Sequence, residues 1–181
     1  MNWSQKTFIF LSEVVGIPVM DAATGLRIGR VVDLVAGLKE MYPRVSGLTM
    51  RERASGKLVF TAWRHVAQLQ HGESLTVNVM TDTFLSDFQI SDAEILLKEM
   101  FWDKQIVDIQ GSKVVRVNDL HLLSEGLHLW VAHVDAGVTG LLRRLGFLAF
   151  INYFVRLVSS CELTDRFISW KFVQPVSHNI G

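Results

Sequence analysis

The sequence predicts a mainly β protein: two tandem small β-barrels of one type, joined by a short helix, with a helical insertion in the second barrel. Short apolar runs alternate with turn residues at intervals of roughly 8–12 positions, as in small barrels. The same pattern then recurs 86 positions later in the 181-residue chain, and one serine-capped segment lies between the copies. About half of the residues (49%) are hydrophobic, which is enough to build a core.

The first copy reads as a series of short strands, expected at residues 14–19, 27–35, 44–50, 57–61 and 74–79. Gly16 and Pro18 favour an edge position for the first of them. The turn that follows ends in Gly25, which can adopt a positive φ. Strict alternation of apolar and polar residues marks the last strand. Closing such short strands into a barrel removes their exposed edges.

The second copy repeats this order, with strands expected at 105–109, 113–123 and 127–135. Between the copies, Ser91 and Glu94 have the spacing of a capping box, which predicts a helix running to about Trp102. The expected divisions are therefore barrel one at 8–80, a linker with a helix at 81–102, and barrel two at 103–176.

Two blocks of sequence recur in the same order, which indicates a duplication. Residues 25–34 match residues 111–120, and residues 60–66 match residues 167–173. The expected equivalent pairs are Gly25 with Gly111, Asp33 with Asp119, and Trp63 with Trp170. Each tryptophan is expected to plug a barrel end, where its N–H can find a backbone acceptor. The second block is offset by 107 positions, so the second copy carries an insertion of 21 residues, at about 139–160.

The first copy carries a spaced set of residues that resembles the PRC-barrel, a small β-barrel named for the photosynthetic reaction centre: Gly16, Pro18, Asp21, Gly25, Gly29, Val31, Asp33 and Leu34. The same barrel occurs at the C-terminus of a ribosome-maturation factor. The resemblance covers roughly residues 8–80 and 101–176, without the insert. Val115 stands where the first copy has Gly29, so the local backbone is expected to differ there.

A narrower resemblance concerns residues 103–119, 134–146 and 169–176, which look like the PRC-barrel region of MgtE-related, magnesium-transporter-like proteins. In those proteins the region precedes cytoplasmic domains. The resemblance implies a fragment or short relative of such a protein, with the transport chemistry outside this sequence. It also implies a location in the cytoplasm, or on the cytoplasmic face of the inner membrane of a bacterium.

Composition excludes several classes of function. Lys plus Arg and Asp plus Glu both number 18, so the whole chain has no net charge to attract nucleic acid or an acidic membrane. Cys161 is the single cysteine, which excludes an internal disulfide and a zinc site of several thiolates. The longest apolar run, residues 147–155, is shorter than the roughly 20 residues that span a membrane. No secretory signal is recognisable, so we expect an intracellular protein.

Candidate ligands for metals are present, but their pattern favours structural roles. Five aspartates could offer oxygen ligands to Mg²⁺, yet most lie in or beside turns, where Asp bonds backbone N–H groups: Asp21, Asp33, Asp108, Asp119 and Asp135. His121, His128 and His133 could lie on neighbouring strands, but no histidine repeats in the first copy. No serine elbow or phosphate loop occurs. We therefore expect no enzyme activity, no cofactor and no metal.

The insert is the most apolar part of the chain, and its aromatic residues lie beside arginines. Its candidate interaction residues are Arg143, Arg144, Phe147, Phe150 and Phe154. The insert could pack between the barrels, form a partner or dimer surface, or lie on a membrane.

The expected function is a non-catalytic, cytoplasmic interaction or regulatory module that binds a protein partner or a second copy, in a magnesium-transporter-like protein. The alternative is an RNA- or ribosome-associated adaptor like the barrel of the maturation factor. A mildly basic stretch from Arg51 to Arg64 would suit that alternative.

Overall fold

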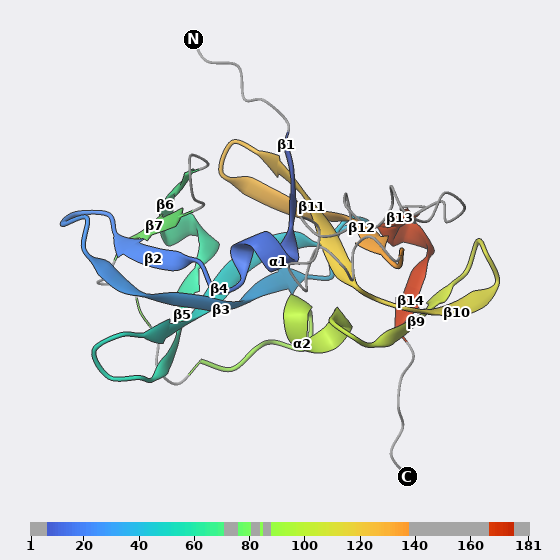
Figure 1. Ribbon diagram of the computed structural model, residues 1–181, viewed down its shortest axis with the longest axis horizontal. Helices are drawn as coiled ribbons and strands as arrows, with labels where there is room; N and C mark the ends of the chain where they lie inside the picture. The colour runs from blue at the N-terminus through green and yellow to red at the C-terminus, as the bar shows by residue number, and fades with distance from the viewer. Residues whose placement is uncertain (1–6, 71–75, 81–83, 85–87, 138–166, 176–181) are drawn as a thin grey trace, which may run out of the picture.

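The protein is described by a computed structural model over residues 7–70, 76–80, 84, 88–137 and 167–175 (Figure 1). Strands dominate this part of the chain, which confirms the predicted mainly β class. The strands are β1 (Thr7–Phe10), β2 (Pro18–Asp21), β3 (Arg27–Gly37), β4 (Arg44–Glu52), β5 (Leu58–Ala62), β6 (Val66–Gln70), β7 (Thr76–Val79), β8 (Glu94–Leu96), β9 (Gln105–Asp108), β10 (Lys113–Arg116), β11 (Asp119–Glu125), β12 (His128–Asp135), β13 (Phe167–Ser169) and β14 (Val173–Pro175). The helical elements are α1 (Leu11–Val14), α2 (Leu97–Phe101) and the 3-10 turns η1 (Trp63–His65) and η3 (Trp170–Phe172).

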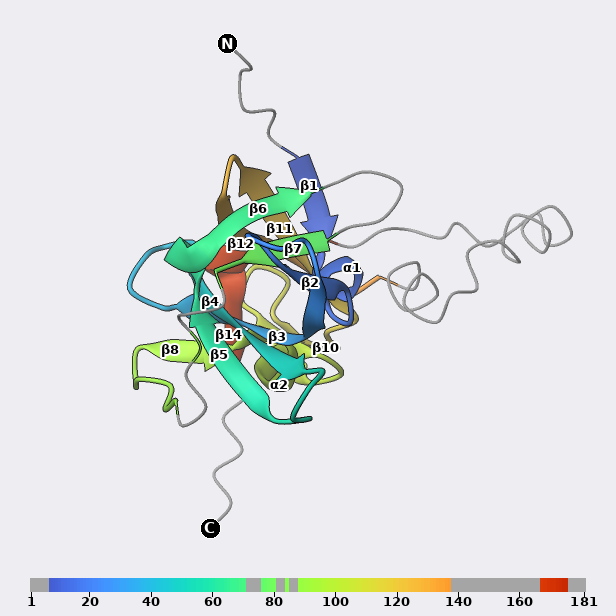
Figure 2. The same cartoon turned by 90° about the vertical axis from the view of Figure 1, so that its left-hand side faces the viewer.

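One large sheet runs through the molecule, in the order β1-β11-β12-β4-β3-β2-β7-β6. Strands β13, β5 and β8 also pair with β12, β4 and β3, and a second small sheet has the order β10-β9-β14. The large sheet curls at the end that holds β2 to β7 (Figure 2), and the small sheet lies at the opposite end (Figure 1). The hairpins β3–β4 and β11–β12 meet in the middle, where Trp130 pairs with Arg44.

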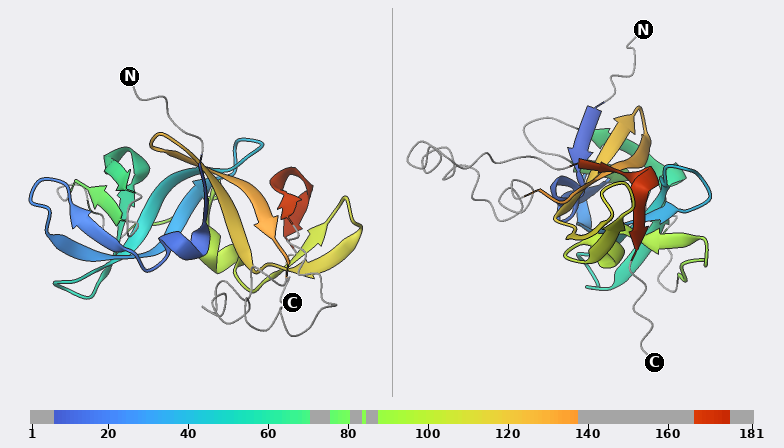
Figure 3. Two further views of the ribbon diagram at one scale, coloured as in Figure 1. Left: turned by 45° about the horizontal axis from the view of Figure 1, so that its top comes forward. Right: turned by 90° about the vertical axis from the view of Figure 1, so that its right-hand side faces the viewer.

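Each of these two hairpins is extended by a strand that is distant from it in sequence. Strand β1 pairs with β11, with Phe10 opposite His121, and β8 pairs with β3, with Leu96 opposite Val35. Leu96 lies 86 positions after Phe10, and His121 lies 86 positions after Val35. Helices α1 and α2 follow these strands directly and lie near the centre of the molecule (Figure 3, left).

Buried aspartates fix both helices to the hairpins. The Asp33 carboxylate accepts hydrogen bonds from the backbone N–H groups of Lys98 (2.7 Å) and Glu99 (3.0 Å), at the start of α2. The Asp119 carboxylate accepts bonds from the N–H (3.1 Å) and hydroxyl (2.5 Å) of Ser12, in α1. The first N–H groups of a helix have no partner within it, so each aspartate acts as a cap from another part of the chain.

The expectation that Asp33 and Asp119 lie in or beside turns is therefore wrong, although both carboxylates do bond backbone N–H groups. Asp33 lies within β3 and Asp119 begins β11. Sequence alone could not reveal that the N–H groups they bind come from residues 65 and 107 positions away.

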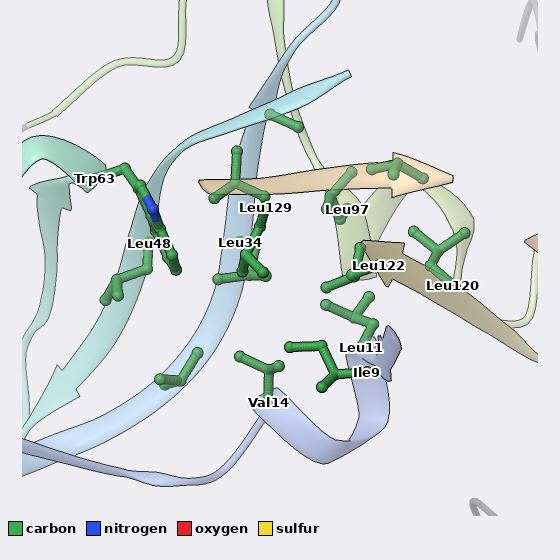
Figure 4. Close-up of a cluster of buried hydrophobic side chains, with 14 of the residues drawn as sticks. Ile9, Leu11, Val14, Leu34, Leu48, Trp63, Leu97, Leu120, Leu122 and Leu129 are labelled. Carbon is green, nitrogen blue, oxygen red and sulfur yellow. The ribbon is translucent and has the colours of Figure 1, made fainter. Parts of the chain in front are cut away.

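The helices fill a single hydrophobic core shared by both hairpins. Leu11 and Val14 of α1 and Leu97 of α2 have no exposed surface, and they belong to the same buried cluster as Leu34 and Leu122 (Figure 4). Fully burying a leucine side chain stabilises a fold by about 1.5–3 kcal/mol. The two helices therefore connect the cores of both hairpins.

The helix predicted from Ser91 is shorter than expected. Residues 94–96 form β8, and the helix begins only at Leu97. The Ser91 hydroxyl bonds the Glu94 carboxylate (3.0 Å), and the Glu94 N–H bonds the Ser91 carbonyl (2.9 Å), which closes a turn instead of capping a helix. The edge of β3 supplies backbone partners for residues 94–96, and this pairing replaces helix formation.

The strand expected at 113–123 is divided into β10 and β11. Strand β3, by contrast, runs unbroken because Gly29 lets it approach β4: a Cβ there would lie 2.6 Å from the Arg51 carbonyl oxygen. Val115 lies in β10, which pairs with β9 alone. Within the break between β10 and β11, the Asn118 side-chain amide donates a hydrogen bond to the Gly137 carbonyl.

The turns expected to match at Gly25 and Gly111 differ by one position. Gly25 has φ +67°, whereas in the turn that contains Gly111 the positive φ falls on Ser112 (+47°). The pairing of β2 with β3 has an irregularity between Val19 and Met20, whereas that of β9 with β10 has none. One extra residue in β3 explains the shift.

Candidate functional site

The predicted interaction residues of the insert lie outside the described residues: Arg143, Arg144, Phe147, Phe150 and Phe154. The two predicted tryptophans are described, and each begins a 3-10 turn after β5 or β13. The Trp63 indole is buried, and its N–H donates to the Leu127 carbonyl. The Trp170 ring packs edge-on against Phe101, with ring centres 5.0 Å apart.

The five candidate aspartates are all buried, and each accepts backbone N–H bonds. Within the described ranges, no three His, Cys, Asp or Glu side chains are placed to hold a metal ion. Burial raises the pKa of Asp33, although three backbone N–H bonds act in the opposite direction. These carboxylates organise the backbone around them.

A surface of stacked rings lies on one side of β1, β11, β12 and β13. We call it the aromatic face, formed by Phe8, Phe10, His121, His133 and Phe167. The His121 ring stacks on Phe8 (4.5 Å between ring centres), Phe10 (4.7 Å) and Phe167 (5.0 Å). Phe8 and Phe167 remain 48% and 41% exposed. Rings held this firmly can contact a ligand at little cost in side-chain entropy.

An apolar cavity of about 420 Å³ adjoins this face. We call it the aromatic pocket, lined by Phe8, Glu40, Met41, Tyr42, Leu123, Trp130, Ala132 and His133. Met41 and Tyr42 come from the tip of the β3–β4 hairpin, and the Tyr42 hydroxyl lies 3.4 Å from the Ser169 hydroxyl. The pocket thus contains residues from both hairpins.

His133 is the titratable group that connects the pocket with the aromatic face. The His121 and His133 ring centres are 5.7 Å apart, and Glu40 lines the same pocket. The Nδ1 atom of His133 is buried and finds no hydrogen-bond partner among the described residues. Burial lowers the pKa of His133 below its usual 6.5. Of the three histidines that were candidates for one site, two are brought together, and His128 lies elsewhere.

We expect His133 to make the protein less stable in mild acid. The unfolded chain binds a proton at His133 more readily than the folded chain, so stability falls as pH drops below about 6.5. His133→Gln removes this titrating group and should reduce the fall in thermal midpoint between pH 8 and pH 5 by on the order of 1–2 °C. The effect is small because solvent screens a partly exposed group. Calorimetry of both proteins at the two pH values checks this. An unchanged fall would contradict it.

A second cavity, of about 590 Å³, lies between the β3–β4 hairpin and the tip of the β11–β12 hairpin. We call it the basic pocket, lined by Gly37, Lys39, Glu40, Arg44, Val45, Ser46, Trp63, Arg64, Val66, Ser91, Ala93, Glu94, Leu127 and His128. The Arg44 guanidinium lies 2.6 Å from Nδ1 of His128 and 6.0 Å from the centre of the Trp130 ring. The Ser46 hydroxyl bonds the Glu94 carboxylate at 2.7 Å and lowers the pKa of Glu94.

The two pockets occupy matching places in the sequence pattern. Residues of the basic pocket lie 86 positions from residues of the aromatic pocket: Gly37 and Leu123, Arg44 and Trp130, Ser46 and Ala132, Glu94 and Phe8, Leu127 and Met41, and His128 and Tyr42. At these positions, one pocket has mostly charged and polar side chains and the other mostly apolar or aromatic ones. The two pockets therefore differ in chemistry at positions that lie 86 residues apart.

Sequence reasoning missed both pockets. Residues 7–10 form a short run of β-branched and aromatic residues, typical of a strand, which could have marked β1. The sequence contains no signal that β1 pairs with β11, so the meeting of Phe8 with His121 and Phe167 could not be predicted.

Comparisons with known proteins identify no relative: no family model, curated protein or solved structure matches this chain. Among the described residues, no helix is both long and apolar enough to cross a membrane.

Proposed function

We propose that this chain is a non-catalytic interaction module that binds a protein partner through the aromatic face and the aromatic pocket. The carrying observation is the exposed stack of Phe8, His121 and Phe167 beside that pocket. Large exposed apolar patches on proteins mark interaction sites, and aromatic side chains dominate their binding energy. The one charged group of the pocket, Glu40, is an exposed side chain at its rim. A partner that presents an apolar side chain fits this chemistry.

We further propose that the module arose by duplication of one PRC-type unit. Matching strand registers support this proposal: Asp33 pairs with Thr49, and Asp119 pairs with Asp135, 86 positions later. Both hairpins also carry an irregularity at the same place, after Val35 and after His121. The pairing of β4 with β5 recurs between β12 and β13: β12 lies 86 positions after β4, and β13 lies 107 positions after β5.

The more specific proposal, a cytoplasmic module of a magnesium-transporter-like protein, rests on the sequence resemblance alone. In this proposal, the partner is the remainder of such a transporter or a protein that regulates the transporter. The RNA-associated alternative predicts that nucleic acid is recovered with the protein instead.

Partner capture tests the proposed function. We expect the tagged chain, expressed in its native cells and cross-linked, to recover one protein reproducibly. The double variant Phe8→Ser/Phe167→Ser should recover at least about tenfold less of it, because interface aromatics commonly contribute 2 kcal/mol or more. Leu58→Ser is the matched control, since Leu58 is 40% exposed but lies on β5.

Thermal unfolding of both variants would show that the fold survives. Equal recovery by the double variant and the wild type would contradict the proposal. Recovery of RNA in place of protein would support the adaptor alternative.

A further inference from the structure

We infer that the basic pocket is a binding site for a small amphipathic anion, a molecule with an apolar body and one carboxylate. This site has one lining residue, Glu40, in common with the aromatic pocket of the proposed partner surface. Its volume of about 590 Å³ is in the range of small-molecule sites. Its wall combines a buried apolar floor with a charged rim, which is the combination that such a ligand needs.

The floor of the pocket is apolar and fixed. Trp63, Val45 and Val66 are buried side chains that line it. The Trp63 indole N–H is already bonded to the Leu127 carbonyl, so this ring is held in place by the tip of the other hairpin. A flat apolar body could pack on this floor without displacing a polar group.

The rim of the pocket offers cations that form no close ion pair, although Lys39 is near enough to Glu94 to help lower the pKa of that carboxyl. Lys39, Arg44 and Arg64 line the rim, and no described carboxylate lies within ion-pair distance (4.0 Å) of any of them. A neutral His128 would accept from Arg44 through Nδ1, at 2.6 Å, and this contact positions the guanidinium. Arginine binds carboxylates with two parallel hydrogen bonds, which gives specificity as well as affinity.

The two acidic residues of the pocket do not cancel this preference. The Glu94 carboxylate accepts hydrogen bonds from the hydroxyls of Ser46 and Ser91. Glu40 is exposed and also lines the aromatic pocket, on the other side of the hairpin tip. With three cations and two carboxylates, the pocket keeps an excess of one positive charge.

A matched pair of probes tests the inference: 2-naphthoate and the uncharged 2-naphthamide, titrated into the isotope-labelled full chain and followed by amide and indole N–H signals in NMR. We expect 2-naphthoate to shift the signals of Trp63 and Ser46 in a saturable way. The amide should bind at least about tenfold more weakly, the effect of one charge-assisted contact.

Variants then assign the contact. Arg44→Gln should weaken 2-naphthoate binding by about tenfold and remove the preference over the amide. Arg116→Gln is the control, because Arg116 is exposed and pairs with Asp103 (3.2 Å), in the other part of the fold. Equal affinity of both probes, full affinity in Arg44→Gln, or shifts confined to Tyr42 and Ala132 of the aromatic pocket would each overturn the inference. An unchanged thermal midpoint of Arg44→Gln excludes misfolding as the cause.

Discussion

Asp33→Ala is expected to destabilise the protein by about 3–5 kcal/mol, because it removes the acceptor of three backbone N–H bonds. Each buried N–H group left without an acceptor costs about 1–3 kcal/mol, although some of these groups will donate to a water molecule instead. Since small domains are stable by only about 5–15 kcal/mol, this loss approaches the whole stability of the fold. Urea unfolding at neutral pH measures it.

The equivalent variant Asp119→Ala should have a similarly large effect, because it frees the N–H groups of Ser12 and Leu120 and the Ser12 hydroxyl. Asp33→Asn should lose less than Asp33→Ala, since its remaining oxygen can still accept from Leu34 and Lys98. Asp92→Ala is the control: this aspartate is exposed, and surface changes usually stay within about 0.5 kcal/mol. A loss below about 1 kcal/mol for Asp33→Ala would show that the caps are not important.

Local sequence signals predicted much of the fold. Alternating apolar residues and turn glycines correctly indicated a mainly β chain, with strands close to the observed β3, β4, β5, β9 and β12. These strands form with partners that are close in sequence, and the period of their apolar residues indicates which face of each strand is buried.

Contacts over long sequence distances escaped prediction for a physical reason. Glu94 follows Ser91 at capping-box spacing, yet residues 94–96 pair with the edge of β3 and the helix begins only after them. The roles of Asp33 and Asp119 depend on which helix the fold brings to them. The aromatic face also depends on contacts over long sequence distances. Phe8, His121 and Phe167 come together through the pairing of β1 with β11 and of β12 with β13, which no local pattern indicates.

Each hairpin is completed by a strand that is distant in sequence: β1 pairs with β11, and β8 pairs with β3. Fragments of the chain can test this exchange of segments. A fragment cut by sequence blocks, residues 7–80, contains β1 and α1 but lacks β8 and α2, which complete β3. A fragment of residues 15–102 omits β1 and α1, whose partner is β11, and keeps β8, α2 and the helix N–H groups bound by Asp33. The two fragments share β2 to β7, so they differ mainly in the exchanged pieces.

Amide NMR spectra and urea unfolding of these two fragments test the exchange most directly. The account predicts dispersed signals and a cooperative transition for residues 15–102. It predicts that residues 7–80 stay unfolded as a monomer, and fold only at concentrations at which β1 of one copy can pair with β3 of another. A folded, concentration-independent monomer of residues 7–80, with residues 15–102 unfolded, would contradict the account.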